Sequence, residues 1–265
     1  MSKVEGVIFD WAGTTVDFGC FAPVKAFIET FQKYGIAVTV KEVREPMGLS
    51  KNEHIRHMLA MPRINNLWQS TFGKKANEQD VQQLYQIFTE LILSVLPSYT
   101  DPIPEVVETI NELKRAGIKI GSTTGYTKKM MEVVIPNARN KGYEVDACYT
   151  AEDTNGLGRP FPYMIFRNME VLKMSATKQV VKVGDTLQDL KEAQYAGVWS
   201  VGVIIGSSEL GLTLGEFESL SKKEQKEKIQ ATREIFLRHG ADFTIETMSE
   251  LTQVISKINQ RMESK

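Results

Sequence analysis

Carboxylate, hydroxyl and glycine residues gather where short apolar runs of the sequence end. Asp10 directly follows the run at residues 4–9, the segment Ser-Thr-Thr-Gly at 122–125 closes a second run, and Asp185 closes a third. An isolated Asp10 could simply cap a turn. Because parallel strands bring their carboxyl ends to one edge of a sheet, we expect these groups to lie together in a ligand crevice.

The same groups are suited to a phosphoryl ligand. Hydroxyls and glycine amides at a strand-to-helix turn can hold phosphate oxygens, and Arg159, in the segment Gly-Arg-Pro, can neutralise the charge. Asp10 and Asp185 offer the oxygen ligands that Mg²⁺ prefers. The cation would also let an anionic carboxylate approach an anionic phosphorus centre. The sequence therefore predicts a phosphoryl site with Mg²⁺ as its cofactor.

Lys51 is a candidate reactive amine. Ser50 and Glu53 match the S/T-x-x-E capping box, which places Lys51 in the first turn of a helix. The positive end of the helix dipole disfavours an ammonium there, which favours the neutral amine that imine formation needs. His54 lies three residues on, on the same helical face, where it could relay protons. Taken alone, Lys51 is more commonly a solvated charge, and His54 and His57 surface or capping side chains.

The elements that must position these groups alternate between strands and helices. Amphipathic segments separate β-branched runs at residues 4–9, 118–123, 180–183 and 198–205. This alternation predicts an α/β fold with a doubly wound, Rossmann-like parallel sheet and helices on both faces. Residues 241–245 are expected to form a last edge strand, followed by a helix to about Met262. Pro136 is expected to kink or end the helix that follows Thr127.

A helical insert is expected between the first two runs, because about a hundred residues separate them and one crossover helix needs far fewer. Its first helix begins near Pro23 and stops at Gly35, and its last helix ends at Pro97. The periodicity of the first of these helices shows an apolar face but not what covers it. We place an all-helical cap domain at residues 18–98 and an α/β core domain at residues 1–17 and 99–265.

Composition excludes several classes of protein. The chain has 265 residues, of which 42% are hydrophobic and 25% charged, as in ordinary globular proteins. Its 32 basic and 33 acidic residues give a net charge of −1, so we expect no nucleic-acid partner and no attraction to an anionic membrane. The longest apolar cluster, residues 91–96, is too short to span a bilayer. Cys20 and Cys148 match no metal-ligand spacing and suit a reducing compartment, so a cytoplasmic location is expected.

Together these motifs resemble the haloacid dehalogenase superfamily over nearly the whole chain, including the position of the helical cap. The resemblance places Asp10 in the first motif as nucleophile, Thr124 in the second, Arg159 in the third, and Asp185 with Asp189 in the fourth. In that family the nucleophile forms an aspartyl-phosphate, and an aspartate two residues on protonates the leaving oxygen. Here that position is Ala12. A missing general acid would slow the expulsion of an alkoxide by about 10²- to 10⁴-fold.

Three hypotheses for the function remain when position 12 is alanine. The protein could bind phosphate or a metabolite without turnover, or it could be a generic phosphomonoesterase or phosphomutase of the superfamily. The second hypothesis leaves both Ala12 and Lys51 unexplained. In the third, the leaving group is carbon rather than oxygen, and its electrons enter an iminium formed by a lysine amine with an aldehyde. The presence of Lys51 favours this third hypothesis.

Four segments resemble the phosphonatases within that superfamily: Asp-Trp-Ala-Gly-Thr-Thr-Val-Asp, Met-Gly-Leu-Ser-Lys, Gly-Ser-Thr-Thr-Gly-Tyr-Thr and Gly-Arg-Pro-Phe-Pro. The resemblance implies cleavage of phosphonoacetaldehyde to acetaldehyde and phosphate in 2-aminoethylphosphonate degradation, through a Schiff base on Lys51 and an aspartyl-phosphate on Asp10. It also implies a homodimer. The residues it assigns to the site are Asp10, the Ala12 carbonyl and Asp185 around Mg²⁺, Asp189 behind them, and Thr124, Gly125, Arg159, Cys20, Met47, His54 and Tyr126 around the substrate.

Overall fold

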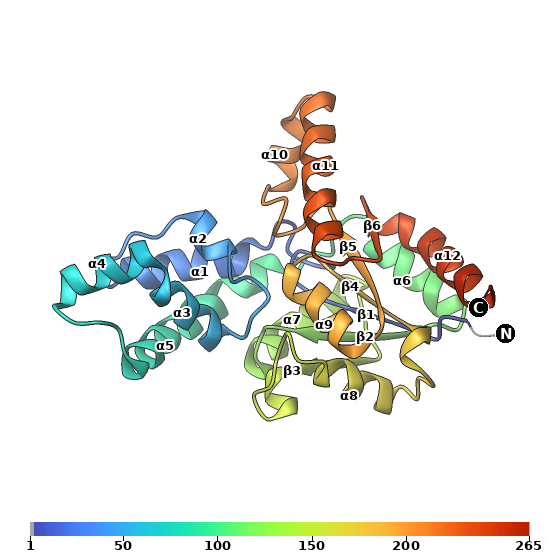
Figure 1. Ribbon diagram of the computed structural model, residues 1–265, viewed down its shortest axis with the longest axis horizontal. Coiled ribbons are helices and arrows are strands. Elements are labelled where there is room, and N and C mark those ends of the chain that lie inside the picture. The colour runs from blue at the N-terminus through green and yellow to red at the C-terminus, as the bar shows by residue number, and fades with distance from the viewer. Residues whose placement is uncertain (1–2, 265) are drawn as a thin grey trace.

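The computed structural model describes residues 3–264, and a parallel sheet of six strands forms its centre (Figure 1). The strands lie in the order β3-β2-β1-β4-β5-β6, and every neighbouring pair is parallel. Their bounds are β1 Gly6–Phe9, β2 Lys119–Thr124, β3 Ala147–Thr150, β4 Val180–Gly184, β5 Trp199–Val203 and β6 Phe243–Ile245. The predicted doubly wound sheet is confirmed, and its strand order reverses beside β1, where such sheets bind ligands.

One strand of the sheet, β3, was not predicted from the sequence. It reads Ala-Cys-Tyr-Thr, and only its last residue is buried. It pairs with β2 alone and forms an edge of the sheet. A short, half-buried edge strand does not have the continuous apolar run that marks the buried strands of a parallel sheet.

Alternate residues of β1 enter different cores, one on each face of the sheet. Val7 and Phe9 belong to a large cluster that includes side chains of α6, α7 and α12, whereas Ile8 packs with side chains of α8 and α9. The bounds of these helices are α6 Val106–Arg115, α7 Lys128–Asn140, α8 Tyr163–Val171, α9 Leu187–Ala196 and α12 Leu251–Glu263. Burial on both faces explains why β1, β4 and β5 are rich in apolar residues.

Five helices follow β1 and form a separate group beside the sheet (Figure 1, left). They are α1 Phe21–Gln32, α2 Val40–Arg44, α3 Lys51–Ala60, α4 Pro62–Phe72 and α5 Glu78–Val95, and the 3₁₀ turn Leu96–Tyr99 follows them. Phe27 and Phe31 of α1 are fully buried within the chain itself, in a cluster that continues into the core of the sheet. We call these helices the cap, and the division into a cap at 18–98 and a core at 1–17 and 99–265 is a proposal that their grouping supports.

Helices α10 (Leu214–Ser219) and α11 (Lys222–Arg238) project from the sheet between β5 and β6 (Figure 1, top). The charged run at residues 221–228 lies at the start of α11, where Ser221 and Glu224 form a capping box. No helix among residues 3–264 has the length and hydropathy needed to cross a membrane.

Pro136 was expected to kink or end the helix after Thr127, and helix α7 runs through it to Asn140, so the second of these two alternatives is wrong. The helix begins after Thr127, whose hydroxyl accepts a hydrogen bond from the N–H of Met130 at 3.3 Å. Proline removes one N–H, which frees the carbonyl of Glu132, four residues earlier. Both Pro136 and Glu132 are exposed, so water can hydrate the freed carbonyl and the helix continues.

Candidate active site

A small cavity lies at the carboxyl end of the sheet, between the core and the cap, and residues of both line it. Its volume is about 20 Å³, enough for about one water molecule, so a larger ligand requires the cap to open. Predicted site residues that line it are Asp10, Ala12, Cys20, Met47, Lys51, Thr124, Gly125, Tyr126 and Arg159. Pro23, Gly48 and Thr186 also line it and were not predicted to be site residues. His54, Asp185 and Asp189 lie outside its lining.

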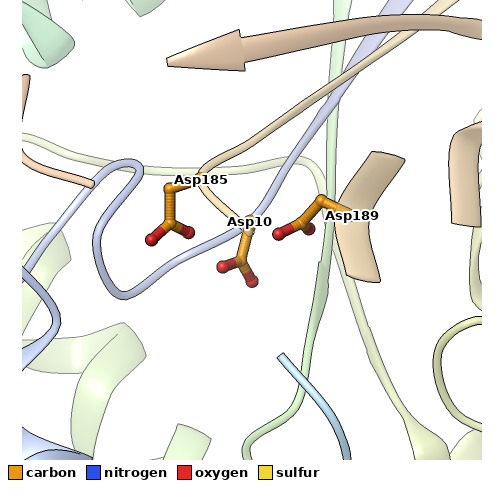
Figure 2. A group of neighbouring side chains, drawn as sticks. All are labelled: Asp10, Asp185 and Asp189. Carbon is orange, nitrogen blue, oxygen red and sulfur yellow. The ribbon is translucent and has the colours of Figure 1, made fainter. Parts of the chain in front are cut away.

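Three buried carboxylates meet at the base of this site (Figure 2). Asp10, Asp185 and Asp189 each offer an oxygen within 4.8 Å of the others. The adjacent strands β1 and β4 place Asp10 beside Asp185. Gly13 has a φ of +87°, and a Cβ there would collide with the Asp185 carboxylate, so only glycine fits this close approach.

Asp185 is held in place but lacks a compensating charge. One of its oxygens accepts a hydrogen bond from the Thr14 hydroxyl at 3.0 Å, and the other accepts one from the Ser208 N–H at 2.8 Å. Burial, together with the negative charges of Asp10 and Asp189, raises the pKa of Asp185 well above its usual value. A divalent cation between Asp10 and Asp185 would relieve this repulsion, so the residues present fit an oxygen-bound metal.

Asp189 already has its counterions within the protein. One of its oxygens lies 2.8 Å from Lys182 Nζ and 3.1 Å from Arg159 Nη1. The other accepts a hydrogen bond of 2.6 Å from Thr186, as part of the capping box of α9. Burial opposes ionisation, but the two cations hold the pKa of Asp189 below its usual value. Asp10 and Asp185 are therefore the carboxylates left for a metal, with Asp189 behind them.

Arg159 is oriented by three carboxylates. Its Nη2 donates to Asp10 Oδ1 at 2.7 Å, its Nε donates to Glu192 Oε2 at 3.0 Å, and its Nη1 faces Asp189. The guanidinium is buried and lines the cavity beside Asp10. It is thus fixed where it can neutralise a phosphoryl group bound next to the Asp10 carboxylate.

Two buried charges that were not predicted from the sequence support this arrangement. Lys182 lies in β4 and pairs with Asp189, while Glu192 pairs with Arg159 and accepts a hydrogen bond from Thr123 at 2.9 Å. The signals were a lysine that interrupts an apolar strand and a glutamate one helical turn after Asp189. Each reads as an ordinary surface charge until the fold shows that it is buried.

Lys51 is the first residue of α3, as predicted, but the predicted capping box is absent. The Ser50 side chain makes no capping hydrogen bond, and the exposed Glu53 carboxylate instead pairs with Arg56 on the next turn. Ser50 lies toward the core loop, where its Cβ is in contact range of a Cβ built at Gly158. The ion pair between Glu53 and Arg56 therefore takes the place of the predicted contact between Glu53 and Ser50.

Burial makes the Lys51 amine unusual. The side chain is 5% exposed, and its Nζ lies 5.0 Å from the ring centre of Tyr126 and 5.9 Å from that of Phe27. Desolvation lowers the pKa of Lys51 to about 8. Burial, more than the helix dipole invoked from the sequence, therefore favours the neutral amine.

His54 is not brought to the cavity. It is fully buried, and its ring is stacked on that of Phe27 with the ring centres 3.9 Å apart. Burial lowers the pKa of His54 well below its usual value, so the ring is neutral. His54 therefore packs against Phe27, outside the lining of the cavity.

Cys20 and Tyr126 are neutral groups within the cavity lining. Burial raises the pKa of the Cys20 thiol and of the Tyr126 hydroxyl well above their usual values. The Tyr126 N–H donates to the Thr124 hydroxyl at 3.0 Å, which shapes the turn after β2. Next to it, a Cβ at Gly125 would lie 2.8 Å from the carbonyl oxygen of Leu49, so the cap loop approaches this turn closely.

Comparisons with known proteins agree with this geometry. The chain is 53% identical over 260 residues to a phosphonoacetaldehyde hydrolase from Lysinibacillus sphaericus, covering 98% of this chain and 97% of that protein. It is 51% identical to a bifunctional phosphonoacetaldehyde hydrolase/aminoethylphosphonate transaminase from Clostridioides difficile, covering 99% of this chain and 41% of that protein. A crystal structure of a phosphonoacetaldehyde hydrolase-like protein from Oleispira antarctica superposes with a TM-score of 0.94 at 39% identity, covering 97% of this chain and 93% of that one.

The match to a protein family covers the cap and the first five strands of the sheet. The model for the haloacid dehalogenase-like hydrolases matches residues 7–203, from β1 to the end of β5. This span contains every side chain that lines the cavity. The chain belongs to the family of haloacid dehalogenase-like hydrolases.

Proposed function

We propose that this protein is a Mg²⁺-dependent phosphonoacetaldehyde hydrolase, which cleaves the carbon–phosphorus bond of its substrate in 2-aminoethylphosphonate degradation. One observation carries the proposal: Lys51, with a pKa lowered to about 8, shares a cavity with Asp10, while position 12 is alanine. The site thus combines a nucleophilic carboxylate with an imine-forming amine and lacks the usual acid for an oxygen leaving group. Relatives that carry this name at about half identity support the proposal.

Lys51 begins the proposed reaction. Its neutral amine adds to the aldehyde carbonyl, and loss of water gives a protonated imine. Asp10 then attacks phosphorus, and the electron pair of the breaking carbon–phosphorus bond moves into the iminium to give an enamine. Protonation of the enamine carbon regenerates the iminium, and water releases acetaldehyde and the free amine.

A second hydrolysis frees Asp10. Water attacks the aspartyl-phosphate and releases inorganic phosphate, so the net reaction consumes one water and gives one acetaldehyde and one phosphate. Arg159, fixed beside Asp10, neutralises charge on the phosphoryl oxygens, and Thr124 and Gly125 offer a hydroxyl and an amide at the same turn. No alkoxide leaves, so an alanine at position 12 is consistent with this sequence of steps.

The proposed cofactor would be held by the carboxylates of Asp10 and Asp185 and by the backbone carbonyl of Ala12, with Asp189 behind them. Asp10 and Asp185 are buried and adjacent, and Asp189 is neutralised by Arg159 and Lys182. When bound, Mg²⁺ supplies positive charge that offsets repulsion between the carboxylate and the phosphoryl group.

Three further proposals concern the surroundings of the site. Cys20, Met47 and Tyr126 line the cavity and would contact the substrate, whereas His54 would act only by packing beneath Lys51. A cytoplasmic location is supported by two free cysteines. A homodimer is supported by the exposed apolar side chains Phe161, Tyr163, Phe166 and Val171 at and before α8, and sedimentation would measure the mass of the assembly.

The proposed function is tested by product release. Phosphonoacetaldehyde and a panel of phosphate monoesters are supplied under identical conditions, with Mg²⁺ or with a chelator. We expect equal amounts of phosphate and acetaldehyde from the phosphonate, no phosphate from the esters, and loss of both products on chelation. Release of phosphate from the esters would instead favour a phosphomonoesterase, and binding of the phosphonate without products would favour a silent binding protein.

A further inference from the structure

Arg44, the last residue of α2, reaches from the cap to the core. Its Nη1 donates to both the carbonyl oxygen and the hydroxyl of Ser208, each at 3.0 Å. Ser208 lies in the loop that follows β5. The Arg44 guanidinium also stacks over the ring of Phe21 at 4.8 Å. This contact therefore fastens the cap helices to a loop on the sheet side of the cavity.

The same loop residue touches the candidate metal site. The Ser208 N–H donates to Asp185 Oδ2 at 2.8 Å, and both residues are buried. Ser208 thus links Arg44 to Asp185, the carboxylate of the candidate metal site, through hydrogen bonds. A group that fixes Ser208 also fixes the hydrogen bond that orients Asp185.

The Arg44 contact is also poised to release. Its Nε and Nη2 are buried without a hydrogen-bond partner. Buried donors that lack partners oppose the closed state, whereas the two charge-assisted hydrogen bonds to Ser208 favour it. Because the cavity holds about one water molecule, substrate can enter only when the cap moves away from the core, and the Arg44 contact joins these two parts. The favourable hydrogen bonds and the unfavourable burial of unpaired donors partly cancel in the free energy of closure. A contact of this kind suits a cap that must close and open in every catalytic cycle.

We propose that Arg44 is a positioning residue, a latch that fastens the closed cap to Ser208 and couples closure to the orientation of Asp185. When the cap closes, Arg44 binds the Ser208 carbonyl and hydroxyl, and the Ser208 N–H is held toward Asp185. This proposal rests on the proposed function in one respect, because the proposed function identifies the cation at Asp185. Closure itself can be measured without any turnover.

The test compares Arg44→Met with Arg63→Met. The methionine at position 44 keeps an apolar stem over Phe21 but removes the donors. Arg63 is a matched control, because it pairs with Glu42 and donates to the Ala37 carbonyl at 2.9 Å, both within the cap region. Closure is followed by reductive methylation of Lys51 with formaldehyde and a hydride reagent, read from the Lys51 peptide by mass spectrometry. Since Lys51 is 5% exposed, it reacts mainly when the cap opens.

We expect Lys51 to react at least about tenfold faster in Arg44→Met than in Arg63→Met, because losing even one of the two charge-assisted hydrogen bonds gives a factor of about ten. Calorimetric titration with Mg²⁺ alone should show weaker binding in Arg44→Met, by less than the ~10- to 100-fold effect of removing a direct partner of a metal ligand. Equal methylation rates in the two variants would overturn the latch. Faster methylation with unchanged Mg²⁺ affinity would overturn the coupling to Asp185.

Arg44→Lys provides a second variant if circular dichroism shows that Arg44→Met does not fold. A lysine keeps one charged donor but cannot present the planar guanidinium, so its methylation rate should lie between those of wild type and Arg44→Met. A rate equal to that of wild type would again overturn the latch. Because neither measurement uses phosphonoacetaldehyde, failure of the latch is distinguishable from failure of the proposed function.

Discussion

The buried Lys51 amine gives a quantitative prediction about pH. Desolvation lowers its pKa from 10.5 to about 8, and the neutral fraction at pH 7 is therefore about 300-fold larger than for an ordinary lysine. Only the neutral amine forms an imine, and the protonated form predominates below the pKa. Imine formation should therefore rise about tenfold per pH unit up to about pH 8 and then level off.

Acetaldehyde, the proposed product, isolates this step because its imine with Lys51 needs neither Mg²⁺ nor Asp10. The protein and a short lysine peptide are incubated together with acetaldehyde and a hydride reagent between pH 6 and 10. Mass spectrometry then measures alkylation of Lys51 relative to the peptide, whose amine has the usual pKa of about 10.4. Lys51→Arg is the control for the assignment of the modified site.

The relative rate of Lys51 alkylation should be nearly constant below pH 8 and should fall above it, as the peptide continues to gain neutral amine. A Lys51 rate that parallels the peptide up to pH 10 would refute the reasoning, because it would mean that burial does not depress the pKa. Absence of any Lys51 product at pH 8 would refute the assignment of this amine to imine formation.

Three substitutions extend the test to other parts of the site. Lys51→Arg should retain Mg²⁺ binding by calorimetry yet lose cleavage of the phosphonate by several orders of magnitude, because a guanidinium forms no imine; wild-type cleavage would remove the covalent step. Lys182→Met should lower the free energy of unfolding by about 3–5 kcal/mol in urea titrations, because it leaves Asp189 with one buried counterion fewer; an unchanged midpoint would show that Arg159 alone suffices. Gly125→Ala should raise KM and lower kcat, because its Cβ would lie 2.8 Å from the backbone of the cap loop. The control Gly215→Ala, whose Cβ would have no atom within 4 Å, should leave both constants unchanged. Equal kinetics in the two variants would mean that full closure of the cap is not needed.

Local patterns in the sequence determined most of the sheet and the chemical types at its edge. The β-branched runs predicted β1, β2, β4 and β5 because buried parallel strands need continuous apolar residues. Asp10 and Asp185 were predicted from their place at strand ends, since parallel strands share one carboxyl edge. Lys51 was predicted at a helix start, and α3 begins there. Each of these predictions depends on residues close to one another in the chain.

The tertiary structure decided how these groups behave. Lys51 has a lowered pKa because Tyr126, from the core, and Phe27, from another cap helix, exclude water from its amine. Lys182 and Glu192 are ordinary charges in sequence, and they become counterions only because strand and helix bury them beside Asp189 and Arg159. Desolvation and pairing depend on which distant segments meet, and no local pattern encodes that. The sequence thus specified the reactive groups, whereas the packing of the cap on the sheet and of the helices on the strands specified their pKa values and their charged partners.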